Sequence, residues 1–290
     1  MSLPLHPAQS VENLKSDLGG SPEQSYIDVS SVSSGAFETF TATFAAYAST
    51  AQGDYLAFTE PGGTKFAVWL DKAANGTPPS GAVYTAADQK IEVDASSGTA
   101  TQVATAFKDA LEADNDFVQY DIVQNGAILT FTANALGTAT DAAPHNTGDT
   151  GAGSIVVAVT QQGAAAGSQN KYVVLRDDDT GLFHAWLNFN SEGVDPDPGG
   201  GSVAIEAAVA GGASASAVAT AMAAAIEAHA EFTSSADGSV VKVVTATNAP
   251  ATDLGAGDSG FTVSVSTQGA ASKYYASLNP GSISNNPSTF

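Results

Sequence analysis

The stretch Phe66-Ala-Val-Trp-Leu-Asp71 organises this sequence, because a closely similar stretch, Phe183-His-Ala-Trp-Leu-Asn188, follows later in the chain. The two stretches contain the only two tryptophans of the protein. They lie 117 positions apart, and the same spacing separates Tyr55 from Tyr172. A spacing shared by a whole segment indicates internal duplication. The sequence therefore predicts two tandem copies of one unit.

Alternation within the repeated stretch indicates a β-strand with two different faces. Phe66, Val68 and Leu70 fall on one face, which we expect to be core. Trp69 and its counterpart Trp186 fall on the other face, against the helix or against a neighbouring unit or subunit. Both tryptophans are therefore candidate interface residues. Stacking of a sugar on these rings is the alternative.

Each copy contains one good helix signal. Val103, Phe107, Ala110 and Leu111 recur at i, i+4, i+7 and i+8, and the pattern returns from Val218 onward. Thr99 and Ser214 precede these two patterns at equivalent positions, and Thr and Ser are favoured as N-cap residues. We expect one stripe of larger side chains on each helix to be buried against a sheet.

A hairpin follows each helix. Its turn is Asn125-Gly126 in the first copy and Asp237-Gly238 in the second, and these two dipeptides suit a type I′ turn best. Further strands are expected over 39–44, 55–58, 65–70, 90–94, 128–132 and 154–160, with counterparts in the second copy. Each copy closes on Gln-Gly-Ala, at 162–164 and at 268–270.

These patterns predict an α+β fold of two tandem repeats, each a small, mostly antiparallel β-sheet with one packed α-helix. Residues 1–36 are polar and rich in Pro, Gly and Ser, and we expect an arm or linker outside the core. This arm is either a disordered leader or a segment that becomes ordered on a neighbouring subunit. We place the first repeat at 37–165 and the second at 166–272. Residues 273–290 form a C-terminal strand and tail.

The C-terminal segment reads like the start of a further copy. Ser-Lys273-Tyr-Tyr-Ala-Ser-Leu278 resembles Asn-Lys171-Tyr-Val-Val-Leu175, which opens the second copy. Such a strand can pair within the molecule, or with a sheet edge of an adjacent molecule. Tyr274 and Tyr275 are therefore further candidate interface residues, and we expect a homo-oligomer.

Composition excludes several classes of protein. Nine Lys and Arg stand against thirty Asp and Glu, giving a formal net charge of −21, so binding of nucleic acid is not expected. The chain has no cysteine, which excludes disulfides, thiolate metal sites and cysteine nucleophiles. The N-terminal residues lack the pattern of a secretory signal. No apolar run reaches the roughly 18 residues of a membrane-spanning helix, so we expect no membrane partner.

No residue set in the sequence predicts catalysis. The histidines do not match between copies, since His184 aligns with Ala67 and His229 with Asp114, and we expect all four histidines to lie at the surface. Gly255-Ala-Gly-Asp-Ser-Gly260 has the spacing of a dinucleotide fingerprint but precedes a strand instead of opening a helix. We therefore expect no catalytic residues and no organic cofactor.

Acidic loops are the remaining candidates for a metal site. Asp177, Asp178 and Asp179 stand together at an expected hairpin tip, and Asp195 and Asp197 lie in a loop. Oxygen-rich loops suit Ca²⁺, but neither group has the EF-hand spacing. Solvated acidic turns are the first interpretation, and Ca²⁺ binding is the alternative.

The repeat resembles a module, usually tandem, of virion structural proteins in tailed bacteriophages. The resemblance rests on the Phe-x-x-Trp-Leu-Asp/Asn strands, the Val-Ala-Thr-Ala helices, the loop Asn146-Thr-Gly-Asp-Thr-Gly-Ala-Gly-Ser-Ile155, the Gln-Gly…Lys/Asp-Tyr openings and the closing Gln-Gly-Ala. It covers roughly residues 50–272 and supplies no catalytic motif.

The resemblance implies a non-enzymatic virion structural protein that contacts other virion proteins and copies of itself. We expect a capsid decoration or cement protein, assembled in the host cytoplasm and carried in the virion. A phage tail tube or fibre component is the first alternative. A bacterial surface adhesin or filament subunit is the second, and an enzyme is the third.

Overall fold

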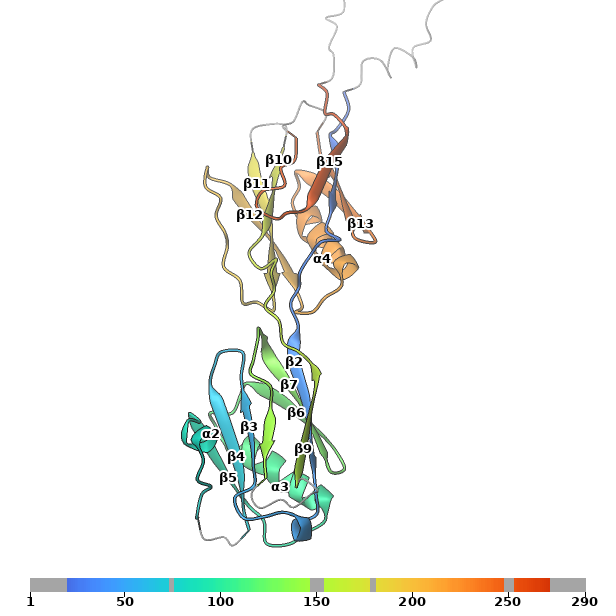
Figure 1. The fold of residues 1–290 in the computed structure, drawn as a ribbon. Coiled ribbons are helices and arrows are strands. Elements are labelled where there is room, and N and C mark those ends of the chain that lie inside the picture. The colour runs from blue at the N-terminus through green and yellow to red at the C-terminus, as the bar shows by residue number, and fades with distance from the viewer. Residues whose placement is uncertain (1–19, 73–75, 147–153, 178–180, 248–252, 272–290) are drawn as a thin grey trace, which may run out of the picture.

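The structure is a computed structural model that describes residues 20–72, 76–146, 154–177, 181–247 and 253–271. Two units lie end to end (Figure 1). The first unit, at the bottom of the figure, contains β2 to β9 with helices α2 and α3. The second unit, at the top, contains β1, β10 to β15 and helix α4. The chain thus starts in the second unit, builds the whole first unit and returns.

The first unit has two four-stranded sheets. One is antiparallel, in the order β6-β7-β2-β9, and consists of β6 (Tyr120–Asn125), β7 (Ile128–Leu136), β2 (Phe37–Phe44) and β9 (Ile155–Gln161). The other has the order β5-β4-β3-β8 and consists of β5 (Gln89–Asp94), β4 (Lys65–Asp71), β3 (Tyr55–Thr59) and β8 (Ala143–His145). In this second sheet β4 and β5 run parallel, while the other pairs are antiparallel.

Helix α3 (Ala100–Ala113) completes the core of the first unit. Its N-terminus is fixed by a capping box, in which Thr99 accepts from the N–H of Gln102 while the Gln102 side chain accepts from the N–H of Thr99. Phe107 and Leu111 are buried, together with Phe66 of β4, in one cluster of apolar side chains. Two short helices, η1 (Tyr47–Ser49) and α2 (Ala82–Thr85), lie in the connections.

The second unit also has two sheets. The larger has the order β13-β14-β1-β15, all antiparallel, and consists of β13 (Phe232–Asp237), β14 (Val240–Thr245), β1 (Gln24–Asp28) and β15 (Thr262–Thr267). The smaller has the order β10-β11-β12 and consists of β10 (Tyr172–Arg176), β11 (Leu182–Phe189) and β12 (Val203–Val209), with β11 and β12 parallel. Helix α4 (Ala215–Glu227) buries Val218, Met222 and Ile226 in the core.

The N-terminal segment is part of this core, contrary to the expectation of an arm over residues 1–36. Strand β1 lies between β14 and β15 and bonds to both. Ile27 and Val29 are completely buried. The polar, Pro- and Ser-rich composition around β1 concealed a five-residue strand in which alternate side chains point inward. Burial of these apolar side chains, rather than docking on another subunit, orders the segment.

The two units share their plan of strand pairing. In the first, β2 pairs with β7 on one side and β9 on the other, while β1 pairs in the same way with β14 and β15 in the second. An isolated antiparallel bridge closes each sheet, joining Ala36 to Ala164 and Ser21 to Ala270. Both bridges end on the Gln-Gly-Ala segments that the sequence marked.

The predicted fold class is confirmed at the coarse level. The described chain is mostly antiparallel sheet with three α-helices, and both predicted long helices and both Asn/Asp-Gly turns are present. The expectation of one small sheet in each copy is wrong, because each unit folds as two sheets with a helix. None of the helices in the described residues is long and apolar enough to cross a membrane.

Two antiparallel segments connect the units. The N–H groups of Ala36 and Ala164 each donate to the other residue's carbonyl oxygen, over 2.9 Å in both directions. Beside them, Gly211 of the second unit approaches Phe37 and Leu136 so closely that a Cβ would lie 2.8 and 2.7 Å from their side chains. The chain therefore crosses the junction twice, and packing as well as the backbone holds the units together.

Candidate functional site

The tryptophan side chains lie inside their own units. Trp69 is 3% exposed and clusters with Tyr55 of β3 and with Tyr84 and Ala87 around α2. Trp186 is 4% exposed. Helix α3 packs on the opposite face of β4, with Phe66. Neither indole therefore offers enough surface in this structure to contact another subunit or to stack a sugar.

The histidine beside Trp186 is buried, so the expectation that all four histidines lie at the surface is wrong for His184. Its side chain is 1% exposed. Nε2 lies 2.7 Å from Oδ1 of Asp195, and Nδ1 lies 2.9 Å from Oγ of Ser202. Asp195 and Ser202 belong to the loop between β11 and β12, which the sequence left as an irregular Gly/Pro-rich segment. His184 thereby anchors this loop to the sheet.

A hydrogen-bonded Asp-His-Ser chain invites comparison with a hydrolase triad. In such a triad the acid orients a histidine that takes a proton from an accessible serine. Here the carboxylate of Asp195 is the exposed end, with 44% of the side chain accessible, while the histidine is buried. The N–H of Asp197 and the His184 side chain hold the pKa of Asp195 below its usual range. We interpret the arrangement as a clamp on the loop.

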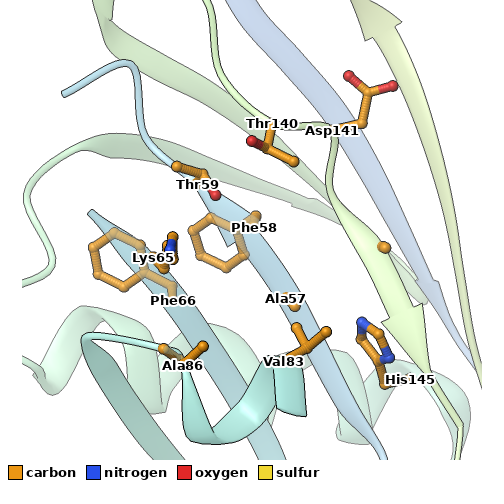
Figure 2. Close-up of a pocket in the computed structure, with 12 residues that line it drawn as sticks. Ala57, Phe58, Thr59, Lys65, Phe66, Val83, Ala86, Thr140, Asp141 and His145 are labelled. Atoms are coloured by element: carbon orange, nitrogen blue, oxygen red, sulfur yellow. The ribbon is translucent and has the colours of Figure 1, made fainter. Parts of the chain in front are cut away.

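A pocket of about 430 Å³ opens on the first unit, between α2 and strand β8 (Figure 2). Phe58 and Phe66, stacked with 5.1 Å between ring centroids, form one side of it. Val83 and Ala86 of the α2 region line a second side. The remaining lining residues of the described chain include three with titratable side chains: Lys65, Asp141 and His145.

These three side chains do not form an acid–base pair. The ring of His145 stacks on Tyr55, with 4.5 Å between centroids, and burial lowers its pKa. Asp141 accepts a hydrogen bond of 2.9 Å from Nε2 of Gln162. The pocket is therefore shaped for a small apolar group and shows no arrangement that would move a proton.

Three carboxylates meet at the edge of the β4–β5 pair. Oxygens of Asp71, Glu92 and Asp94 lie within 4.8 Å of one another. Asp71 is buried and accepts from Nε2 of Gln52 over 2.9 Å and from the N–H of Gly76 over 2.6 Å. Burial raises the pKa of Glu92, and Asp94 and Asp71 raise it further.

The second unit has a less charged counterpart of this cluster. Asn188 stands where the first unit has Asp71, and its Nδ2 donates to Oε1 of Glu206 over 2.6 Å. Its Oδ1 accepts from the N–H of Gly193 over 2.8 Å, and Gln169 takes the place of Gln52. The second unit thus has an amide in place of Asp71 and Ala208 in place of Asp94, and keeps one carboxylate, Glu206.

We expect Asp71→Asn to stabilise the first unit. The new amide can accept the bonds from Gln52 and donate to Glu92, as Asn188 does, and it removes one of three adjacent negative charges. Relief of like-charge repulsion near the surface is worth roughly 0.5 to 1 kcal/mol. Thermal unfolding at pH 7 in EDTA measures the change, with Asp109→Asn on the exposed face of α3 as control. A lower melting temperature for Asp71→Asn alone would contradict the expectation.

The carboxylates Asp71, Glu92 and Asp94 were not predicted as a group, and the predicted metal residues do not come together in the described chain. Asp195 bonds to His184, and both Asp195 and Asp197 accept from backbone N–H groups of their own loop. Asp177 accepts from the N–H of Gly181 across its turn. Asp178 and Asp179 lie outside the described residues, as do Tyr274 and Tyr275. Ca²⁺ binding at the acidic turns stays a prediction.

Two buried glutamates were missed from the sequence. Glu23 and Glu38 are each 1% exposed and precede Ile27 and Phe40 on the inward face of β1 and β2. The alternation itself carried the signal, since Glu38, Phe40, Ala42 and Phe44 occupy one phase of the strand. A charged residue in that phase was overlooked because glutamate is rarely buried without a partner.

Comparison with known proteins gives no relationship. No protein-family model matches the chain, and no curated protein matches its sequence significantly.

Proposed function

We propose that this protein is a non-enzymatic structural protein of a bacteriophage virion, built from two duplicated α+β repeats that act through subunit contacts. The observation that carries the proposal is the shared pairing plan of the two units, down to the bridges Ala36–Ala164 and Ser21–Ala270. An elongated molecule of two similar units presents the same kinds of edge and loop twice. Such repetition suits contacts with a regular surface.

The polar clusters support a structural role. His184 anchors a loop, and Gln52 and Gln169 tie the strand that carries each tryptophan to a neighbouring turn. His145, whose pKa is lowered by burial, lines the pocket beside α2, and its ring stacks on Tyr55. These groups stabilise the fold, and they leave the outer surface for partners.

Within this class we propose a capsid decoration or cement protein, located in the virion and assembled in the host cytoplasm. A tail tube or fibre component is the first alternative. An adhesin or filament subunit is favoured by one observation, the open edges at β9 and β15. Val156 on β9 is 55% exposed, and a free strand edge of this kind can accept a strand from another molecule.

We expect deletion of residues 273–290 to abolish or shorten assemblies while leaving both units folded. The deleted segment repeats the opening sequence of β10, so in this proposal it supplies a strand to a neighbouring molecule. Sedimentation velocity and negative-stain electron microscopy of the full chain and the deletion variant measure assembly, and circular dichroism checks the fold. Unchanged assembly of the deletion variant would refute strand exchange, and a full chain that stays monomeric at all concentrations would refute self-association.

A further inference from the structure

Each unit buries one glutamate with an oxygen that lacks a hydrogen-bond partner. In the first unit this atom is Oε1 of Glu38, and in the second it is Oε2 of Glu23. Both side chains are 1% exposed. The two glutamates occupy equivalent positions. Glu38 lies two residues after Ala36, which bridges to Ala164, and Glu23 lies two residues after Ser21, which bridges to Ala270. The same unusual feature therefore occurs twice.

The surroundings of the two glutamates also correspond. The N–H of Gly163 donates to Oε2 of Glu38 over 2.7 Å, and the neighbouring Gln162 donates to Asp141 over 2.9 Å. In the second unit Gln268 donates to Asp253 over 3.0 Å, beside Glu23. The glutamine in each case begins Gln-Gly-Ala. In both units the glutamine of this motif thus bonds to an exposed aspartate that lies near the buried glutamate.

This environment disfavours a negative charge on either glutamate. A buried carboxylate is costly unless its oxygens are hydrogen-bonded or a cation lies close by. Glu38 faces Asp141 from the loop before β8 and Tyr120 from β6, while Glu23 faces Asp253. Burial raises the pKa of both glutamates, and the neighbouring aspartates raise it further. Among these described neighbours there is no cation to offset the charge.

We propose that Glu23 and Glu38 keep their protons to a higher pH in the folded protein than ordinary glutamates do, and that loss of these protons as pH rises loosens the two Gln-Gly-Ala segments. The neutral acid can stay buried against Gly163 in the first unit. An ionised one gains free energy by reaching water, and this movement separates β2 from the end of β9. The Ala36–Ala164 pair beside Glu38 joins the two segments that cross between the units. Its loosening makes the junction more flexible as pH rises.

The direction of the pH effect follows from the pKa shift. The folded-state pKa of each glutamate is raised above its pKa in the unfolded chain. Each glutamate therefore contributes fully to the free energy of unfolding when the pH is below its unfolded-state pKa. This contribution is lost as the pH rises through the folded-state pKa. A rise in pH through the raised pKa should therefore open the segments, and a return to lower pH should close them.

The test measures the titration of the two carboxyl groups and the hydrogen exchange of the two Gln-Gly-Ala segments. Side-chain ¹³C NMR of the full chain follows the carboxyls of Glu23 and Glu38, which should titrate clearly above the ordinary value of about 4.3. Hydrogen exchange at Ala164 and Ala270, whose N–H groups bond across the bridges, should show protection falling about tenfold for each pH unit above the raised pKa. In Glu38→Gln the pH dependence at Ala164 should vanish while that at Ala270 persists. Glu23→Gln should do the reverse.

Asp109→Asn serves as control, because it removes one negative charge from an exposed position on α3. It should leave the pH dependence of hydrogen exchange unchanged at both Ala164 and Ala270. If Glu38 and Glu23 titrate at or below the ordinary value, the proposal is wrong whatever the variants do. It is also wrong if Glu38→Gln keeps the pH dependence of the native protein at Ala164. The carboxyl titration is read in the native chain, so the first outcome does not depend on any variant folding.

Discussion

Deletion of residues 1–29 should unfold the second unit and leave the first unit folded. Strand β1 lies between β14 and β15, so its removal breaks the larger sheet in two and leaves unpaired backbone groups on both neighbours. Ile27 and Val29 are completely buried, and each contributes about 1.5 to 3 kcal/mol to the core. The combined loss is comparable to the about 5 to 15 kcal/mol that stabilises a typical domain.

The two tryptophans report on the units separately, because Trp69 lies in the first and Trp186 in the second. Chemical unfolding of the deletion variant, followed by fluorescence in Trp69→Phe and Trp186→Phe backgrounds, should show a normal transition for Trp69. Trp186 should have the emission of an exposed indole before denaturant is added. Deletion of residues 1–19, which keeps β1, is the matched control. A native transition for Trp186 without residues 1–29 would show that β1 is dispensable.

Substitution of His184 should have the second-largest effect. His184→Ala removes both hydrogen bonds of a buried ring and leaves a cavity beside Tyr172. Buried polar truncations of this kind cost about 2 to 4 kcal/mol. Release of Asp195 and Ser202 should also expose the β11–β12 loop. We expect a lower unfolding midpoint of the second unit together with faster proteolysis between 190 and 202.

Two further variants serve as controls for His184→Ala. His229→Ala removes a half-buried histidine of the same unit, whose ring lies 6.0 Å from that of Phe183, and should lower the midpoint by less than His184→Ala does. Ser202→Ala removes one of the two bonds to His184 and should cost about 1 kcal/mol. A fluorophosphonate probe should fail to label Ser202 in the native protein. Labelling of Ser202 that disappears in His184→Ala would show a catalytic triad and overturn the clamp interpretation.

Local patterns in the sequence were sufficient to predict most elements. The helices follow from apolar spacing and N-caps, since Thr99 and Ser214 begin them as expected. The hairpins at Asn125-Gly126 and Asp237-Gly238 follow from turn chemistry. Each of these signals acts over a few residues of chain, so neighbouring side chains alone decide it.

Long-range pairing was not predictable in this way. Glu38 and Gly163 are far apart in sequence, and nothing local indicates that a carboxylate on β2 will be enclosed by a Gln-Gly-Ala segment. The clamp between His184 and Asp195 depends on how a Gly/Pro-rich loop folds back over a sheet. The strand that carries Trp69 was correctly predicted to be core, but the indole of Trp69 lies inside its own unit and not at an interface.

The sequence by itself determined the repeated strands, the two helices, the turns and the absence of cysteine chemistry, because these depend on residue type and short spacing. Only the tertiary structure decided that the chain begins in the second unit, that β1 completes its sheet, and that Trp69 lies under a short helix. The physical reason is that a strand's partner is selected by the burial and hydrogen bonds of the whole sheet. The stretch Phe66–Asp71 indicates a core strand whose sheet partners β3 and β5 are close in sequence, whereas β1 pairs with β14 and β15 from the far end of the chain.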